Sequence, residues 1–396
     1  MKIRHPEKIN KPFNPIKKKP DWIRSKLTNS KEFFLTKTII NSNNLVTVCQ
    51  EANCPNISEC WSKRHATFMI MGDTCTRACA FCDVKTGKPS SLDPLEPFKV
   101  SSAVNKLNLK HVVITSVDRD DLEDGGANVF AKTIAATRAL SPTCRIETLI
   151  PDFGGKHESL NVVLAAKPDV LNHNLETVCT QYPRARPGGN YNRALQLLDR
   201  AHRHRPAITT KSGLMVGLGE TWDELLGALI DLRRVECDIL TIGQYLRPSI
   251  AHLSVDRYYH PTEFEALKQI ALQMGFGHVE SGPLVRSSYH AHKQADALAA
   301  DNKNHLVVRA VKELRVLLVD GDPQGTDIRD HESFFLQVAL SPVTDHYVQV
   351  DVKAPGTPKI IIFFLSPIIL DVDFLIFPSE TIFISTFGIF LIVSII

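Results

Sequence analysis

Six of the nine cysteines fall between Cys49 and Cys82, in two groups of three. The second group, Cys75, Cys79 and Cys82, has C-x3-C-x2-C spacing and follows a short apolar segment. Three thiolates on one short loop can bind three irons of a [4Fe–4S] cube and leave its fourth iron without a protein ligand. An iron left open in this way can bind a small molecule, whereas a structural zinc site closes with four ligands. The spacing therefore favours a cluster that chelates a ligand over a zinc ion.

The first group, Cys49, Cys54 and Cys60, has a different spacing, C-x4-C-x5-C, and is not a repeat of the second. By itself it leaves structural zinc as a fair alternative. Beside the other group it predicts a second cluster, also one ligand short. The remaining cysteines lie in or beside predicted core elements and are interpreted as small buried hydrophobic residues: Cys144, Cys179 and Cys237.

Short apolar runs alternate with amphipathic stretches from about Thr67 onward. The runs are rich in Val, Ile, Leu and Thr, which predicts buried strands at 67–71, 111–116, 145–150, 169–172, 208–214 and 238–243. The stretches between them predict helices at 126–140, 158–166, 191–204, 221–235 and 261–274. A Thr221-x-x-Glu224 capping box and Pro261 mark two helix starts. Repeated β-then-α units imply a parallel sheet. The expected fold class is α/β, a partial (β/α)6 TIM-type barrel, because six units are too few for an eightfold barrel.

The chain is expected to divide into three parts. Residues 1–65 form an N-terminal extension with the first three cysteines, residues 66–292 the barrel, and residues 293–396 an atypical apolar tail. Within the tail, 295–312 predicts a helix and 314–320 a strand. Its last uninterrupted apolar run, 381–396, is shorter than the ~20 residues that a spanning helix needs. Disorder and membrane association are both open for this tail, with a membrane anchor not favoured.

Composition and charge indicate the compartment and the class of partner that we expect. Of 396 residues, 43% are hydrophobic and 22% are charged, and the net charge is only +3, so no overall field points to nucleic acid. Basic residues cluster near the start, at 17–19, 24 and 26, and predict a solvated arm. The first residues lack the apolar segment of a signal peptide. We therefore expect a cytoplasmic protein, in which cysteines stay reduced and serve as ligands.

The C-x3-C-x2-C loop resembles that of the radical S-adenosylmethionine (SAM) superfamily, and the whole pattern resembles the lipoyl synthase family. The resemblance runs from about Asp21 to His292 and rests on the paired cysteine groups with Arg286-Ser-Ser-Tyr289. Further matching segments are 49–61, 66–75, 115–126, 173–177, 184–188, 210–221, 244–249 and 282–290. Two parts depart from the family pattern. The sequence of Val178–Arg184 differs from it, and the tail from Ala295 lies outside the match.

The resemblance implies two [4Fe–4S] clusters and SAM as cofactors. Carried over by position, the second cysteine group binds the cluster that holds SAM, and the first group binds an auxiliary cluster. A serine of the Arg-Ser-Ser-Tyr motif supplies its fourth ligand, Ser288 or alternatively Ser287. From the residues alone, this serine pair would be interpreted as a turn whose hydroxyls bond the backbone. A labile oxygen ligand suits a cluster that is consumed as a sulfur source, since oxygen is harder than thiolate.

The implied reaction is sulfur insertion at C6 and C8 of a protein-bound octanoyl group. Alkyl C–H bonds are neither acidic nor polarised, so a radical must be supplied by the cofactor. The implied partners are octanoylated carrier domains (2-oxoacid dehydrogenase E2 and glycine cleavage H protein) and a ferredoxin- or flavodoxin-type reductant. The alternatives are another two-cluster radical SAM sulfurtransferase, such as a methylthiotransferase or a biotin-type enzyme, and a non-catalytic iron–sulfur electron-transfer module.

Polar residues at strand ends are the remaining candidates, because the site of such a barrel lies at those ends. Asn174 and Glu176 follow the fourth predicted strand, and Lys211 is expected near the end of the fifth. All three could bond the cofactor, although surface or salt-bridge roles fit them equally. Gly125–Gly126 could let the backbone approach the cofactor, with a simple turn as the slightly favoured alternative. Arg286 could contact substrate or cluster, or pair with an acid.

Overall fold

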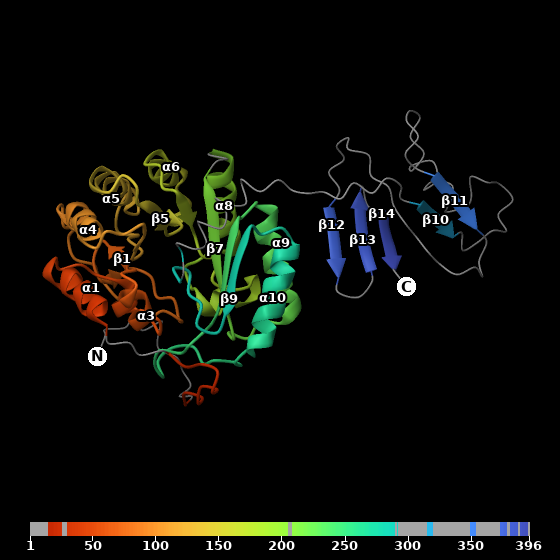
Figure 1. The fold of residues 1–396 in the computed structure, drawn as a ribbon, viewed down its shortest axis with the longest axis horizontal. Helices are drawn as coiled ribbons and strands as arrows, with labels where there is room; N and C mark the ends of the chain where they lie inside the picture. The colour runs from red at the N-terminus through yellow and green to blue at the C-terminus, as the bar shows by residue number, and fades with distance from the viewer. Residues whose placement is uncertain are drawn as a thin grey trace. The chain divides into compact units, whose positions relative to one another are not determined.

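The computed structural model describes residues 15–25, 30–204, 208–289 and 291, together with five strand segments between residues 315 and 394. The chain divides into two compact units, residues 1–304 and 305–396. The first unit contains the cysteine groups and the main sheet (Figure 1).

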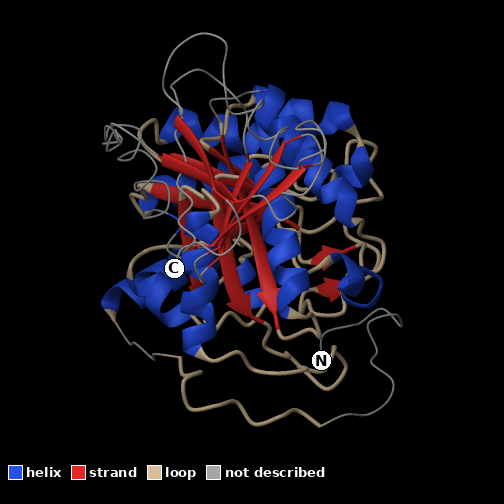
Figure 2. Ribbon diagram, turned by 90° about the vertical axis from the view of Figure 1, so that its right-hand side faces the viewer, coloured by secondary structure: helices blue, strands red, loops and turns tan. Residues whose placement is uncertain are grey.

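The first unit is built on a parallel sheet of seven strands in the order β1-β4-β5-β6-β7-β8-β9. Figure 2 shows these strands at the centre, with helices outside them. The strands are β1 (Thr67–Ile70), β4 (His111–Ser116), β5 (Arg145–Leu149), β6 (Val170–Asn172), β7 (Thr209–Val216), β8 (Ile239–Gln244) and β9 (His278–Gly282). Each neighbouring pair in this order is parallel. The two strands at the ends of the order, β1 and β9, form the edges of the open barrel.

Each of the first six strands is followed by a helix before the next strand begins. These helices are α4 (Glu96–Lys106), α5 (Ala127–Leu140), α6 (His157–Ala165), α8 (Tyr191–His204), α9 (Trp222–Arg234) and α10 (Pro261–Gln273). Short elements also occur in the connections: 3-10 turns at Phe153–Gly155 and Cys179–Gln181, and α7 (Tyr182–Ala185). The predicted α/β fold with a partial barrel is confirmed. The seventh strand, β9, was missed because only Val279 in its sequence, HVESG, is a buried apolar residue.

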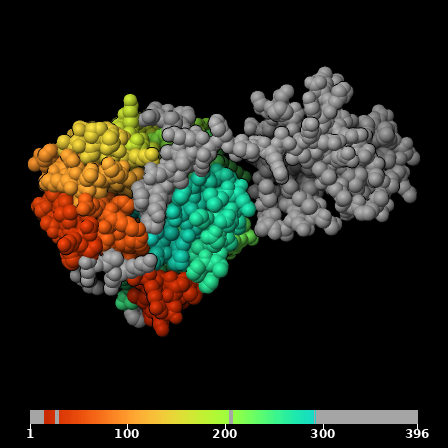
Figure 3. Space-filling view, viewed as in Figure 1, coloured from red at the N-terminus to blue at the C-terminus, as the bar shows by residue number. Residues whose placement is uncertain are grey.

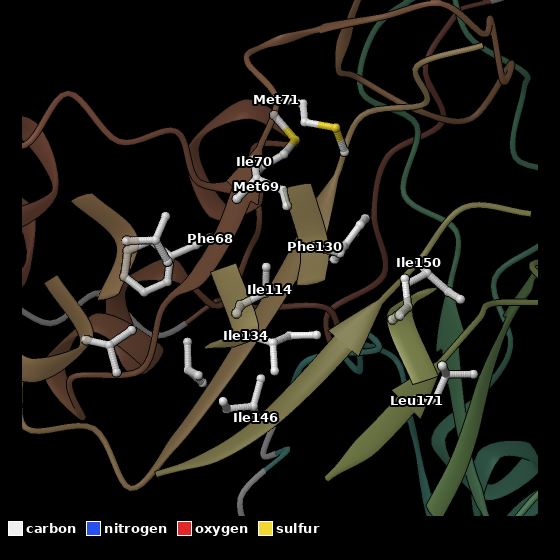
Figure 4. Packing of buried hydrophobic residues seen from close by; sticks show 14 of the residues in the cluster. Phe68, Met69, Ile70, Met71, Ile114, Phe130, Ile134, Ile146, Ile150 and Leu171 are labelled. Carbon is white, nitrogen blue, oxygen red and sulfur yellow. The ribbon is translucent and has the colours of Figure 1, made fainter. Parts of the chain in front are cut away.

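Alternate residues of each strand face opposite sides of the sheet, as the pleat requires. One side is apolar and packs on the helices: Figure 4 shows Phe68, Ile114 and Ile146 of neighbouring strands beside Phe130 and Ile134 of α5. Residues on the other side face the barrel interior, and they include polar and charged side chains. The barrel interior therefore contains both packed side chains and side chains that could take part in a reaction.

Two helix starts behave as their sequences predict. Thr221 and Glu224 form a reciprocal capping box at the start of α9, which satisfies two backbone N–H groups that would otherwise lack partners. Pro261 is the first residue of α10, and His260 caps that helix together with Glu263.

The N-terminal part adds three helices and a segment that crosses the barrel mouth. The helices are α1 (Lys31–Ser42), α2 (Val48–Glu51) and α3 (Ile57–Ser62). Lys17 donates a hydrogen bond to the carbonyl of Asp256 at 2.6 Å, and the Trp22 ring packs edge-on against His260 at 5.0 Å. In Figure 3 this segment (dark red) lies beside residues that precede and form α10. The predicted basic arm is exposed, as expected, but its described residues contact the barrel.

The second unit is described by its strands alone. Parallel β10 (Arg315–Val319) and β11 (Gln349–Lys353) form one pair. Antiparallel β12 (Asp373–Phe377), β13 (Thr381–Thr386) and β14 (Ile389–Ser394) form a second sheet. The predicted strand at 314–320 is confirmed, and the predicted helix at 295–312 lies outside the described residues. The apolar run 381–396 is occupied by two strands, consistent with its β-branched composition. Among the described residues, no helix has the length and hydropathy to cross a membrane.

Candidate functional site

A short loop at the mouth of the barrel carries the second cysteine group. Two-residue strands β2 (Thr74–Cys75) and β3 (Lys85–Thr86) pair in parallel and close the base of this loop. The loop is fixed elsewhere by backbone hydrogen bonds: Ala80 donates to Ala185, and Leu253 donates to Ala80. Cys75, Cys79 and Cys82 all line a cavity of about 450 Å3, which we call the large cavity.

Arg77, between Cys75 and Cys79, links this loop to residues that follow the carboxyl ends of strands β4 and β5. Its guanidinium makes two 2.7 Å hydrogen bonds to Asp120 and lies 2.7 Å from a carboxylate oxygen of Asp152. It is also 3.4 Å from Asp118. Burial raises the pKa of Asp152, but the bonds from Arg77 outweigh it and bring that pKa down to about 2. A buried cation shared by three carboxylates thus holds the loop in place.

The thiols of the large cavity favour their protonated form. Burial, with a smaller contribution from neighbouring acids, raises the pKa of Cys75, and burial raises that of Cys79 to about 12. The sulfur of Cys75 accepts hydrogen bonds from the backbone N–H groups of Arg77 and Asp118 at 3.4 and 3.3 Å. Thiolates become stable here when a metal centre displaces their protons. Three soft donors that line one cavity, each able to bind its own iron, fit one [4Fe–4S] cluster.

The structure brings Asn174 and Glu176 to the large cavity, beside the cysteines. The Asn174 amide donates to the Glu176 carboxylate at 3.1 Å and to the Ser287 hydroxyl at 3.3 Å. Glu176 has a left-handed backbone conformation, with φ of 71°, which is uncommon outside glycine and is often found at functional sites. Burial raises its pKa, which Arg186 opposes. These predicted residues are therefore placed where a bound small molecule would meet them.

Two further residues of the large cavity were not predicted. His173 is buried, and its Nδ1 lies 2.8 Å from the carbonyl of Ile150. Burial lowers its pKa to about 4, so the ring is neutral near pH 7. Arg186 is also buried, and it donates to the carbonyl of Asn174. The sequence motif that contains Asn174 also contains His173, but a motif does not tell which of its side chains face a cavity.

Lys211 does not lie where the sequence analysis placed it. It is the third residue of β7, in the amino-terminal half of that strand, and not near its end. Its side chain is fully buried and pairs with Glu147 at 2.9 Å. It is not among the residues that line the large cavity. The misplacement arose because β7 continues two residues beyond the predicted end, to Val216.

Gly125 and Gly126 have a packing role that the structure makes plain. Both have positive φ, and Gly126 precedes the first residue of α5. A Cβ on Gly126 would lie 2.2 Å from the sulfur of Met71, and one on Gly125 would lie 3.0 Å from the Phe153 ring. Neither glycine lines the large cavity. The tight turn, which was the favoured alternative, accounts for them.

The first cysteine group lines a second, smaller space of about 30 Å3, which we call the small cavity. Cys49, Cys54 and Cys60 come from α2, α3 and the loop between them, just ahead of edge strand β1. Burial and the neighbouring Cys54 raise the pKa of Cys49 to about 11. Burial, Cys49 and Cys54 together raise that of Cys60 to about 12. The three thiols of this group therefore favour their protonated form, as those of the large cavity do.

The turn that follows edge strand β9 completes the small cavity. Ser288 lines it together with the three cysteines, whereas Ser287 lines the large cavity. Two long-range hydrogen bonds hold the turn against the cysteine segment. Asn56 donates to the carbonyl of Leu284 at 2.7 Å, and the Tyr289 hydroxyl donates to Glu59 at 3.1 Å. The structure thus brings the two predicted parts of the auxiliary site together, and it places Ser288 rather than Ser287 among the thiols.

Arg286 lines both cavities. Its guanidinium donates to the carbonyl of Val285 at 2.6 Å. Burial lowers its pKa, although Cys54 opposes that effect. A half-buried cation between two groups of thiols would stabilise negative charge on either side of it.

The remaining cysteines differ in burial. Cys144 and Cys237 are buried, as predicted, but Cys179 is exposed, so its interpretation as a buried residue was wrong. In the described part of the chain, no three His, Cys, Asp or Glu side chains are arranged to hold one metal ion. Thiolates that bind separate corners of a cube do not need to converge on a single point.

Part of the chain matches a known protein family. Residues 69–232 match the family model described as the radical SAM superfamily. This matched segment is similar to a radical SAM domain, and such a domain implies one [4Fe–4S] cluster and SAM as cofactors. This domain includes Cys75, Cys79 and Cys82 and the segment with Asn174 and Glu176.

Parts of several solved structures also resemble this chain. Methylornithine synthase (PylB) has a TM-score of 0.41 and 14% identity, over 62% of this chain and 69% of that one. SuiB of Streptococcus suis bound to S-adenosylmethionine has a TM-score of 0.44 and 10% identity, over 59% and 57%. HydG, a maturase of the [FeFe]-hydrogenase, has a TM-score of 0.45 and 16% identity, over 58% and 54%. This chain thus spans little more than half the length of SuiB and HydG.

Proposed function

We propose that the protein is a lipoyl synthase, which inserts sulfur at C6 and C8 of an octanoyl group attached to a lysine of a carrier protein. The observation that carries the proposal is the pairing of two cavities. One holds the radical SAM cysteines, and the other brings a second cysteine group together with Ser288. A reaction that joins sulfur to unactivated carbon needs both a radical source and a sulfur source.

In the proposed enzyme each cavity has its own ligands. Cys75, Cys79 and Cys82 would hold the cluster that binds SAM. Cys49, Cys54, Cys60 and Ser288 would hold an auxiliary cluster that provides sulfur. When bound, the first cluster and SAM supply hydrogen-atom abstraction from carbon, and the auxiliary cluster supplies the sulfur atoms.

The protein's own part is to bind, orient and separate these groups. Asn174 and Glu176 present an amide and a carboxylate to a ligand in the large cavity, and Arg77 keeps the cysteine loop from shifting. Apolar side chains at the carboxyl ends of the strands, among them Met69, Leu149 and Met215, also line that cavity and suit a saturated acyl chain. Arg286 lies between the two cavities and would separate the radical side from the sulfur side.

The proposed partners follow from the proposed reaction. The acyl group would arrive on a carrier domain of a 2-oxoacid dehydrogenase E2 or of a glycine cleavage H protein. A ferredoxin- or flavodoxin-type protein would deliver electrons, and the expected compartment is the cytoplasm.

The test uses full-length protein reconstituted with iron and sulfide without oxygen. We expect about eight irons per chain, 5′-deoxyadenosine release with a strong reductant, and lipoyl formation on an octanoylated carrier domain. About four irons without SAM cleavage would instead support an electron-transfer module. SAM cleavage without lipoyl product would support another two-cluster sulfurtransferase. Either result would refute the assignment.

A further inference from the structure

A charged pair is buried between strands of the main sheet, and neither of its residues lines the large or the small cavity. Lys211 of β7 and Glu147 of β5 have side chains that are 0% and 1% exposed, with 2.9 Å between Nζ and Oε1. The amide of Asn172 also donates to Oε1 of Glu147 at 2.9 Å. The proposed function gives no role to these three buried side chains.

His111, the first residue of β4, connects these buried side chains to the small cavity. Its side chain is 4% exposed, and Nε2 lies 3.4 Å from Oε2 of Glu147. His111 also lines the small cavity together with Cys49, Cys54 and Ser288. Among the described residues, both ring nitrogens are buried and neither has a hydrogen-bond partner, so Nε2 meets Glu147 through a longer ion-pair contact and Nδ1 has no polar contact. One edge of the ring thus faces a carboxylate, and the other edge has a nitrogen that the protein leaves unused.

Stability does not account for this arrangement. Taking a lysine and a glutamate out of water costs several kcal/mol per ion, and apolar residues of similar size are often as stable or more so. Burial raises the pKa of Glu147, but Lys211 and His111 outweigh it and bring that pKa down to about 2. The carboxylate is therefore anionic at neutral pH, and an anion facing Nε2 fixes the orientation of the imidazole ring.

We propose that His111 is a positioning residue of the small cavity, where its Nδ1 hydrogen-bonds to a cluster sulfide or to the Ser288 oxygen, with the ring held by the buried Glu147–Lys211 pair. This inference rests on the proposed function, because it assumes that Cys49, Cys54 and Cys60 hold a cluster. Groups that orient or bond the ligands of a metal centre typically change metal affinity by about 10- to 100-fold when they are lost.

The experiment isolates the small cavity within the full chain. In a Cys75→Ala, Cys79→Ala, Cys82→Ala background, all bound iron would belong to the first cysteine group. Iron release to a chelator and the Mössbauer spectrum are then compared for His111→Asn, His111→Gln and His111→Phe. The asparagine amide can occupy the place of Nδ1, whereas the glutamine amide can occupy that of Nε2. Thr148→Val is the matched control, because Thr148 is buried next to Glu147 and its hydroxyl has no partner among the described residues.

We expect iron release about tenfold faster or more for His111→Phe and His111→Gln, with an altered Mössbauer spectrum. His111→Asn and Thr148→Val should keep the behaviour of the background protein. The inference is overturned if His111→Phe matches Thr148→Val, or if His111→Gln retains iron better than His111→Asn. A background protein that binds no iron would refute the two-cluster function and this inference together. Circular dichroism of each variant separates loss of iron from loss of fold.

Discussion

The two cysteine-lined cavities are built in opposite ways. The large cavity takes its three thiols from one eight-residue loop, closed at its base by β2 and β3 and fastened by Arg77. The small cavity takes three thiols from a segment ahead of β1 and its serine from the turn after β9. One site is local in sequence, and the other exists only because the open barrel brings its edge strands together.

Because the two cavities are built differently, they depend on different contacts. A local loop needs an anchor that holds its shape, and Arg77 is that anchor. A site made from both edges of the sheet needs bonds across the gap, and Asn56 and Tyr289 provide them. Loss of an anchor should therefore affect one cavity at a time.

The largest effect should come from removing one thiol from each cavity. Cys79→Ala is expected to abolish SAM cleavage, because the cluster that holds SAM loses a ligand. Cys54→Ala should keep SAM cleavage, lose lipoyl formation, and retain about four irons per chain. Iron content and 5′-deoxyadenosine release measure both. Equal loss of cleavage in the two variants would mean that the cavities do not act separately.

Arg77→Met should destabilise the fold by roughly 3 kcal/mol, because Asp118 and Asp152 lose a buried cation, although Arg193 remains 3.2 Å from Asp152. Urea unfolding measures this change. Arg24→Met is the matched control: Arg24 pairs with Asp21, but its side chain is 75% exposed, so its loss should cost less than about 1 kcal/mol.

The same variant should change the acid response. The pKa of Asp152 is lowered to about 2 in the fold, so its stabilising contribution is full above the ordinary value near 3.9 and is lost as the pH falls toward 2. In Arg77→Met that acid-dependent loss should be smaller. An unchanged slope of stability against pH in this range would contradict the role given to Arg77.

Asn56→Ala should cost about 1 kcal/mol, because the half-buried carbonyl of Leu284 loses its donor. Its effect should fall on the small cavity, with faster loss of the auxiliary iron and unchanged SAM cleavage. Asn43→Ala is the control, since Asn43 bonds only within its own helix end, to Ile39 and Ser42. The comparison fails if both variants release iron at the same rate.

The smallest effect should separate the neighbouring serines. Ser287→Ala removes a 3.3 Å hydrogen bond from Asn174 and should weaken SAM binding about fivefold, or roughly 1 kcal/mol, with eight irons retained. Ser288→Ala should leave SAM affinity unchanged but speed iron loss from the small cavity. Equilibrium SAM binding and chelator kinetics distinguish them, and an exchange of the two phenotypes would make Ser287 the ligand.

Features that are local in the chain could be predicted from the sequence, whereas features that depend on sheet register could not. The spacing of Cys75, Cys79 and Cys82 already implies one loop, and six strands stand out as apolar runs. Strand β9 does not, because its residues are mostly polar. His111 and Glu147 are single polar residues within apolar strands, and nothing in their spacing marks them as neighbours. Lys211 was misplaced for the same reason, since a strand's length and inward face emerge only when its partners are known.

The gap between β1 and β9 also has a consequence for how the protein is made. The hydrogen bonds across it join residues 228 and 230 positions apart in the chain. Contacts this distant form late, after most of the barrel has been synthesised and folded. The loop with Cys75 emerges with all three of its thiols together, so it is ready to receive iron much earlier. In the proposed enzyme, maturation would therefore be ordered in time: the centre that binds SAM can be loaded first, and the auxiliary centre can be loaded only when the end of the barrel has folded.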